Sequence, residues 1–234
     1  LMPRLSEFPM VIAPEQDDMS DEMVAALESY VRGGGRLLVT GAAAYERFGG
    51  DFLGVEGDAV ETGKGYHVPG LDGAVAAPSP QWRLVEARGA RPLKPVLENR
   101  LLSSAKGQYV SAAVNAAGDG RVAYAPFALF AAYEAERSAI LRAFIGDILD
   151  ELAVEGLISV VAPSYVDAVF RRRGAARIIH LVNRATGAPA QWDNAAVDEI
   201  PRVGPVKIAM RADAEPAGGI EAFEGGAPEW EWRG

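Results

Sequence analysis

Four acidic residues that follow an apolar stretch form the densest group of chemically capable side chains in the sequence: Asp17, Asp18, Asp21 and Glu22. Carboxylates grouped in this way can bind a divalent cation or the hydroxyl groups of a sugar. Acidic side chains also stabilise the first turn of a helix, and Ser20 is a good N-cap for a helix beginning here. We favour the capping interpretation, and we keep Asp17 and Asp18 as candidate ligand-binding residues.

The chain has two histidines, His67 and His180, and no cysteine. His180 lies in an alternating apolar stretch, which favours a hydrogen-bonded structural role. His67 follows Gly65 and Tyr66 in a polar segment beside Lys64, so we treat it as a candidate for a ligand-binding loop. Neither histidine has an acidic partner at metal-ligand spacing, and thiolate ligands are excluded. We therefore expect no metal site and no cofactor.

A serine nucleophile activated by lysine is the one nucleophilic pattern in the sequence. Ser103 and Lys106 have the S-x-x-K spacing, but no strand or pocket signal precedes them. The glycines at 33–35 precede an apolar run instead of following one, so they are not a phosphate-binding loop. We assign no catalytic residue, and a hydrolase with a relocated nucleophile remains an alternative function.

Three tryptophans near the C-terminus are of the type that stacks on sugar rings: Trp192, Trp230 and Trp232. Packing within a β-domain or against a partner explains Trp230 and Trp232 at least as well, because they alternate near the terminus. Trp192 is a candidate ligand-binding residue. A carbohydrate-binding module that uses Trp192 or the loop at 60–70 is a second alternative function.

The elements that would position these residues begin with a β-α-β unit. Residues 8–14 read as a buried strand that looks central in its sheet, and residues 20–32 have helical apolar spacing. Three glycines then stop the helix, and residues 36–40 form a buried strand that turns at 41–44 into a new helix. Strands joined in this way are parallel. Because no β-α unit precedes the first strand, we expect a longer protein or a partner that supplies one.

The remaining pattern predicts two domains. Residues 1–155 form an α/β domain with a parallel sheet and a β-rich insertion with long loops at 49–105. A strand at 120–126 and helices at 127–133 and from about 135 complete it. Residues 156–234 form a small antiparallel β-sandwich that contains a hairpin at 165–183.

Composition limits the partners of this chain. With 234 residues and a net charge of −9, a nucleic-acid-binding surface is not expected. No apolar run approaches the roughly 18 residues that span a bilayer, so we expect no membrane association. No signal peptide is visible at the start, which favours the cytoplasm over secretion.

Four stretches of the chain resemble a known arrangement: VIAPEQ (11–16), SDEMVAALESYVRGGGRLLVTG (20–41), GRVAYAPFALFAAY (120–133) and RIIHLVNRATG (177–187). They are similar to the C-terminal half of family 42 glycoside hydrolases, the bacterial β-galactosidases and their relatives. In that family a catalytic (β/α)8 barrel is followed by a trimerisation domain. The trimerisation domain has a class I glutamine-amidotransferase-like, flavodoxin-like fold, and a small β-domain follows it.

The resemblance implies a region without catalysis of its own. An amidotransferase would carry a cysteine just after the strand that ends at Thr40, whereas this chain has Gly41-Ala42-Ala43-Ala44 there. The barrel that carries the two catalytic carboxylates of the glycosidase family is absent. The implied role is assembly and accessory support of a glycoside-hydrolase-like protein. The implied partners are further copies of the chain or a companion barrel, with carbohydrate as a possible ligand.

Overall fold

The computed structural model describes residues 2–153, 156–184, 202–222 and 228–233. The chain divides into two compact units, Leu1–Val154 and Glu155–Gly234, and each is considered by itself. None of the described helices has the length and hydrophobicity needed to cross a bilayer.

Helix α1 (Asp21–Arg32) begins and ends where the sequence predicts. Ser20 is extended, and its hydroxyl oxygen accepts a 3.3 Å hydrogen bond from the Met23 N–H. This bond satisfies one of the free donors at the helix start. At the other end, Gly34 adopts a φ of +104° and its N–H donates to the Val31 carbonyl at 2.9 Å. Glycine adopts this left-handed conformation with less strain than any residue that has a Cβ.

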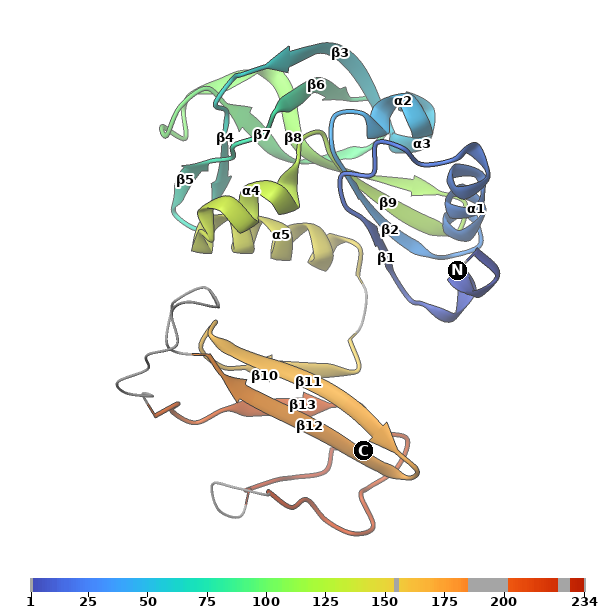
Figure 1. Ribbon diagram of the computed structural model, residues 1–234, viewed down its shortest axis with the longest axis vertical. Coiled ribbons are helices and arrows are strands. Elements are labelled where there is room, and N and C mark those ends of the chain that lie inside the picture. Colours follow the sequence, from blue (N-terminus) through green and yellow to red (C-terminus); the bar gives the residue numbers. More distant parts are fainter. Residues whose placement is uncertain (1, 154–155, 185–201, 223–227, 234) are drawn as a thin grey trace, which may run out of the picture. The chain divides into compact units, whose positions relative to one another are not determined.

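Three parallel strands form one half of the main sheet: β1 (Val11–Ala13), β2 (Arg36–Thr40) and β9 (Gly120–Ala125) (Figure 1). The predicted β-α-β unit is therefore confirmed. The prediction that its first strand is central is wrong, because β1 has three residues and lies at the edge of the sheet. Ile12 is accordingly 39% exposed.

The other half of the main sheet is antiparallel, so the sheet is mixed, and the predicted parallel sheet is confirmed only for β1, β2 and β9. The strand order is β1-β2-β9-β8-β7-β4-β5. A tight turn at Gly118 reverses the chain, and β8 therefore runs antiparallel to β9. The antiparallel strands are β8 (Ala105–Ala117), β7 (Arg91–Leu97), β4 (His67–Gly70) and β5 (Gly73–Ala76).

The segment at 49–105 is rich in strands, as predicted, but it is not a loop-rich insertion. Strands β4, β5 and β7 join the main sheet, and most of the connections between its strands are short. Strands β3 (Val55–Thr62) and β6 (Gln81–Ala87) form a separate antiparallel pair with a bulge between Gly57 and Val60. Helices α2 (Ala44–Phe48) and α3 (Gly50–Leu53) precede that pair.

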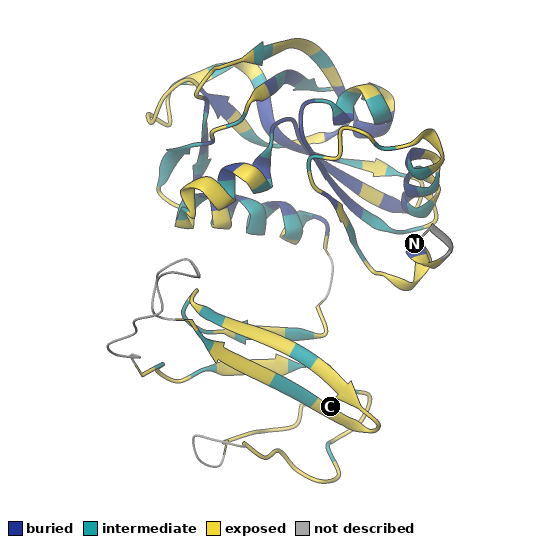
Figure 2. Cartoon of the chain, viewed as in Figure 1, coloured by how far each residue is buried: buried dark blue, intermediate teal, exposed yellow. Residues whose placement is uncertain are grey.

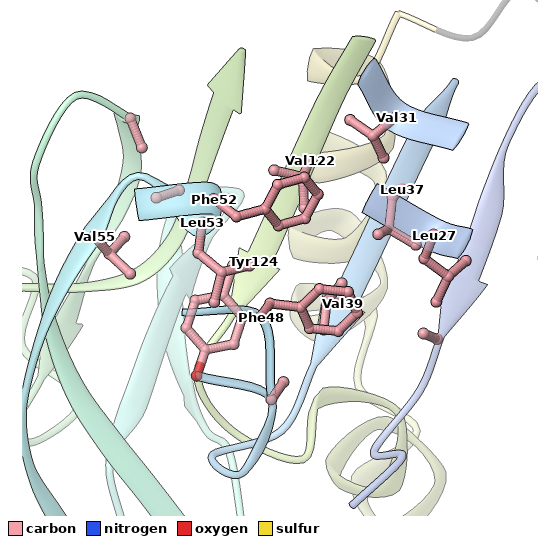
Figure 3. Close-up of a cluster of buried hydrophobic side chains, with 14 of the residues drawn as sticks. Leu27, Val31, Leu37, Val39, Phe48, Phe52, Leu53, Val55, Val122 and Tyr124 are labelled. Carbon is pink, nitrogen blue, oxygen red and sulfur yellow. The ribbon is translucent and has the colours of Figure 1, made fainter. Parts of the chain in front are cut away.

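Two hydrophobic clusters cover the two faces of the main sheet. Successive residues of a strand point to opposite faces, so Leu37 and Val39 pack in one cluster and Leu38 in the other. Figure 3 shows the first cluster, in which residues of α1, α2 and α3 meet β2 and β9. The second cluster joins α4 (Leu129–Glu136) and α5 (Ala139–Glu151) to the sheet.

A stacked aromatic pair lies at the centre of the second cluster. Trp82 and Phe127 are both fully buried, and their rings are 4.0 Å apart between centroids and 8° from parallel. The indole N–H of Trp82 donates to the Ala77 carbonyl at 3.3 Å. A buried indole therefore keeps its polar atom satisfied while it fills the core between β6 and the helices.

Two arginines cap the C-terminus of α5. Arg36 Nε donates to the Leu152 carbonyl at 3.0 Å, and Arg121 Nη1 donates to the Glu151 carbonyl at 2.9 Å. The last carbonyls of a helix have no partner within the helix, and cations stabilise this end of its dipole. Residues at the amino ends of β2 and β9 therefore fix the C-terminal end of α5, the last helix of the first unit.

The C-terminal unit consists of two antiparallel pairs. Strands β11 (Val166–Arg173) and β12 (Ala176–Asn183) form the predicted hairpin, with Gly174 at a φ of +59° in its turn. Strands β10 (Ile158–Val161) and β13 (Lys207–Met210) form the other pair. Every residue described in this unit is half-buried or exposed (Figure 2). The sandwich arrangement stays a prediction.

Replacing Gly120 by alanine should destabilise the first unit, whereas replacing Gly146 should stabilise it. A Cβ at Gly120 would lie 1.9 Å from the Val31 carbonyl oxygen, and this clash with the backbone cannot be relieved by a side-chain movement. We therefore expect the free energy of unfolding to fall by about 2–4 kcal/mol. Gly146 lies inside α5 with nothing within 4 Å of its Cβ position, and alanine there should add about 0.5–1 kcal/mol. Urea unfolding curves of both variants check this, and equal effects would contradict the packing described.

Candidate functional site

The candidate site is the edge of the sheet at which the three parallel strands end. In open α/β sheets this carboxyl edge is the usual ligand-binding position. Three segments meet here: the loop after β1, the turn after β2 and the segment between β9 and α4. Whether the edge can bind or react depends on the polar groups that these segments present.

Glu15 joins the loop after β1 to the end of β2 and to the first turn of α4. One carboxylate oxygen, Oε1, accepts a hydrogen bond from the Thr40 hydroxyl at 2.7 Å and another from the Phe130 N–H at 3.0 Å. The Glu15 N–H in turn donates to Thr40 Oγ1 at 3.2 Å. Glu15 adopts a φ of +45°, which is unfavourable for a residue with a Cβ. These hydrogen bonds hold it in that conformation.

The carboxylate of Glu15 occupies the N-terminus of α4. The helix has no side-chain cap from its own N-cap residue, Ala128, whose N–H donates to Ser79 Oγ at 3.0 Å. The Phe130 N–H, which has no partner within the helix, donates a hydrogen bond to the Glu15 carboxylate. A helix N-terminus favours anions through its free N–H groups and its dipole. The chain therefore fills its own anion-binding position.

The turn after β2 has no reactive side chain. Gly41 has a φ of +106°, and its N–H lies 3.1 Å from the Ala125 carbonyl and 2.9 Å from the Phe127 carbonyl. The Gly41 carbonyl accepts a 3.1 Å hydrogen bond from the Tyr124 hydroxyl. Burial of Tyr124 raises the pKa of its phenol, so the hydroxyl stays protonated and acts as a donor. The backbone of the turn is thus held by internal hydrogen bonds.

Arg83 fixes the outer side of the same turn. Its Nε donates to the Ala42 carbonyl at 3.3 Å, and its Nη2 pairs with Glu46 of α2. The guanidinium lies 4.7 Å from the centroid of the Tyr45 ring, which is a cation–π distance. Only 11% of the Arg83 side chain is exposed, so its positive charge stabilises this turn and is largely inaccessible to a ligand.

The acidic residues singled out in the sequence lie at this edge but do not converge. Asp17 and Asp18 are both exposed, and Asp17 Oδ1 is 3.9 Å from the position of a Cβ on Gly41. Asp21 pairs with Arg47 at 2.6 Å in the first turn of α1. No group of three or more acidic, histidine or cysteine residues in the described part of the chain is arranged to hold a metal ion.

His67 lies at the start of β4, which four strands of the main sheet separate from β1, and it pairs there with Leu97 of β7. Its Nδ1 is buried and has no hydrogen-bond partner within the described structure. Burial, with a smaller contribution from the charge of Arg100, lowers the pKa of the imidazole. The structure brings His67 and the two aspartates to different places. Trp192 lies outside the described residues.

Lys106 belongs to a network that the sequence analysis missed. Its ammonium lies 3.7 Å from Glu61 and 3.8 Å from Glu98, and 5.3 Å from the centroid of the Tyr66 ring. The Tyr66 hydroxyl donates to Glu61, and its hydrogen bond with Lys106 raises the pKa of the ammonium. A lysine held protonated is a poor base for Ser103, which is exposed in the β7–β8 loop.

Glu15 and Thr40 were also absent from the sequence-based candidates. The sequence signal available was their position: Thr40 is the polar residue that ends one apolar strand, and Glu15 follows another. Such residues meet at one edge when the strands are parallel. Their hydrogen bond spans 25 residues and the bond to Phe130 spans 115, so local spacing does not reveal either contact.

Several solved glycoside hydrolases contain this fold. A cold-adapted β-galactosidase from Rahnella sp. R3 has 16% identity and a TM-score of 0.57 over 76% of this chain. A β-galactosidase from Bacillus circulans has 17% identity and a TM-score of 0.54 over 76%. An α-L-fucosidase from Paenibacillus thiaminolyticus has 16% identity and a TM-score of 0.63 over 88%.

This likeness concerns the fold. The matched region covers 28%, 27% and 34% of those three chains, so the present chain corresponds to about a quarter to a third of each. No protein-family model and no curated protein sequence matches the chain. The chain is thus a mixed α/β fold of the kind that forms part of larger glycoside hydrolases.

Substitutions of Glu15 should separate the stability that its carboxylate contributes from the strain of its left-handed backbone. Glu15→Ala removes both accepted hydrogen bonds while keeping the left-handed backbone, so we expect a loss of about 2–3 kcal/mol in the free energy of unfolding. Glu15→Gly removes the same bonds but relieves the backbone, and should be about 1 kcal/mol more stable than the alanine variant. Chemical denaturation followed by circular dichroism measures both. An alanine variant as stable as the parent would contradict the role assigned to the carboxylate.

The imidazole of His67 should titrate below the ordinary pKa of 6.5. The folded state favours the neutral ring, so the stability that His67 contributes is present above pH 6.5 and is lost as the pH falls through the lowered pKa. NMR titration of a His180→Gln variant isolates the His67 resonances. The further change Arg100→Gln should move the pKa upward, and a His67 pKa at or above 6.5 in the parent would refute the assignment.

Proposed function

We propose that this chain is a non-catalytic assembly and accessory region of a glycoside-hydrolase-like protein. In this proposal its first unit is an amidotransferase-like, flavodoxin-like domain that has lost its reactive turn, and its C-terminal unit is a small β-sandwich. Further copies of the chain, or a companion barrel domain, are its partners.

The observation that carries this proposal is that the carboxyl edge of the parallel strands has no reactive side chain in its turn and is bridged by the hydrogen bonds of Glu15. We call this the closed carboxyl edge. An active site at this edge needs a nucleophile in the turn after β2 and free donors to stabilise developing charge. Here the turn presents Gly41 and three alanines, and Glu15 takes the Phe130 N–H. The Thr40 hydroxyl beside the turn is buried and bonded to Glu15, and the buried Tyr124 hydroxyl donates to the Gly41 carbonyl.

The likeness to glycosidases supports the choice of parent protein. In the two β-galactosidases the shared region is only part of a longer chain. A region that shares their fold and has a closed edge fits a supporting role better than an independent enzyme. The two alternatives, a hydrolase acting through Ser103 and Lys106 and a carbohydrate-binding module acting through Trp192, have no comparable observation in their favour.

The purified chain should show no turnover of aryl glycosides or of glutamine. The physical reason is that the turn after β2 presents only Gly41 and three alanines, and that Glu15 already accepts the hydrogen bond of the Phe130 N–H. The measurement is chromogenic product release and ammonia release, each compared with a matched sample of the Thr40→Val variant. Turnover by the parent chain that disappears in the variant would reject the proposal.

The same preparation should self-associate or bind a separately supplied barrel domain. Sedimentation velocity across a concentration series measures the first, and co-sedimentation with a family 42 barrel measures the second. A chain that remains monomeric and binds no barrel at any accessible concentration would contradict the assembly role, whatever the turnover assays show.

A further inference from the structure

We infer that two copies of this chain contact one another head to tail, with the β7–β8 hairpin tip of one copy in a groove beside β1 of the next. The tip consists of Arg100, Leu101 and Leu102. The groove lies between the segment at 5–9 and helix α1. This inference rests on the proposed assembly function and names the surfaces that would perform it.

The tip exposes two adjacent leucines on a rigid loop. Leu101 is 65% exposed and Leu102 is 55% exposed. Large apolar side chains that protrude together are a feature of interaction sites, since each remains hydrated until a partner covers it. Arg100 precedes them and is also exposed, so the tip combines an apolar contact with a positive charge.

Internal hydrogen bonds hold the tip in shape. The Leu101 N–H donates to Asn99 Oδ1 at 2.9 Å. The Ser104 hydroxyl donates to the Leu101 carbonyl at 2.6 Å, and the Glu98 N–H donates to the Ser104 carbonyl at 2.9 Å. A loop that is already ordered loses little conformational entropy on binding, which favours association.

The groove is lined by residues of α1, by the segment at 5–9 and by three glycines. Its floor includes Tyr30 and Ala26 of α1, and Phe8, which is 45% exposed, forms part of its wall. The glycines at 33–35 leave the opposite wall without side chains. The Tyr30 hydroxyl donates to the Phe8 carbonyl at 2.9 Å and so fixes the width between the two sides.

Charge favours a second copy of this chain as the occupant. The chain carries a net charge of −9, whereas its tip is basic. Glu22 is exposed on α1 one turn before Ala26, on the same side of the helix as the groove. A copy that presents Arg100 to this region gains opposite charge beside the apolar contact.

The tip cannot fill the groove of its own copy. Strand β1 is one edge strand of the main sheet, and β7 is separated from it by β2, β9 and β8 (Figure 1). The two surfaces therefore face different neighbours, and the contact is heterologous. Repeating it produces a closed ring or an open chain of copies.

Charge substitutions in the tip and in the groove should each abolish self-association. Leu101→Asp combined with Leu102→Asp disables the tip, and Ser29→Arg places a bulky cation at the groove. Each change is at an exposed position. We expect the dissociation constant to rise at least about tenfold in both variants. Leu71→Asp is the matched control, because Leu71 is 70% exposed on a different hairpin and should leave association unchanged.

An equimolar mixture of the tip variant and the groove variant is the decisive sample. Each contributes the surface that the other lacks, so sedimentation velocity should show a one-to-one heterodimer that neither forms alone. Circular dichroism and tryptophan fluorescence, to which the buried Trp82 contributes, verify that both variants are folded.

The outcomes are distinguishable. A parent chain that self-associates while the tip variant associates equally well would overturn the inference and leave the assembly proposal standing. Variants that dissociate but do not combine would also overturn it, since tip and groove would then have other partners. A monomeric parent chain overturns this inference directly, and binding to a barrel domain then decides whether the assembly proposal stands.

Discussion

The hydrogen bonds of one carboxylate hold the carboxyl edge of the sheet together. Glu15 satisfies the buried hydroxyl of Thr40 and an N–H at the start of α4, and it links the loop after β1 to the end of β2 and to α4. An unsatisfied buried polar group is costly, so the fold depends on this residue despite its unfavourable φ of +45°. The same bonds occupy the Thr40 hydroxyl and the Phe130 N–H, two groups that a reactive centre at this edge could otherwise use.

Local signals were sufficient for part of the fold. Helix α1 follows from its N-cap serine, its apolar period and its glycine stop, and the β11–β12 hairpin follows from alternating strands around Gly174. The antiparallel half of the sheet was missed because its strands have weak local signals: β7 contains Pro92 and Pro95, and β4 contains Pro69. The hydrogen bonds of Glu15 to Thr40 and Phe130 were missed for another reason, since they span 25 and 115 residues.

The two halves of the main sheet have different properties. The parallel half carries the closed edge, and its outer strand β1 borders the groove. The antiparallel half carries the Lys106 network, in which Glu61 and Glu98 surround one ammonium, and ends in the exposed hairpin tip. Polar groups are thus bonded internally in both halves of the sheet.

The arginine cap on α5 determines how mechanical load enters the first unit. A pull on the chain beyond Ala153 acts first on carbonyls that Arg36 and Arg121 hold, and these arginines belong to strands in the middle of the sheet. Tension at this point therefore bears on the two arginine hydrogen bonds to β2 and β9 as well as on the hydrogen bonds of the last helical turn.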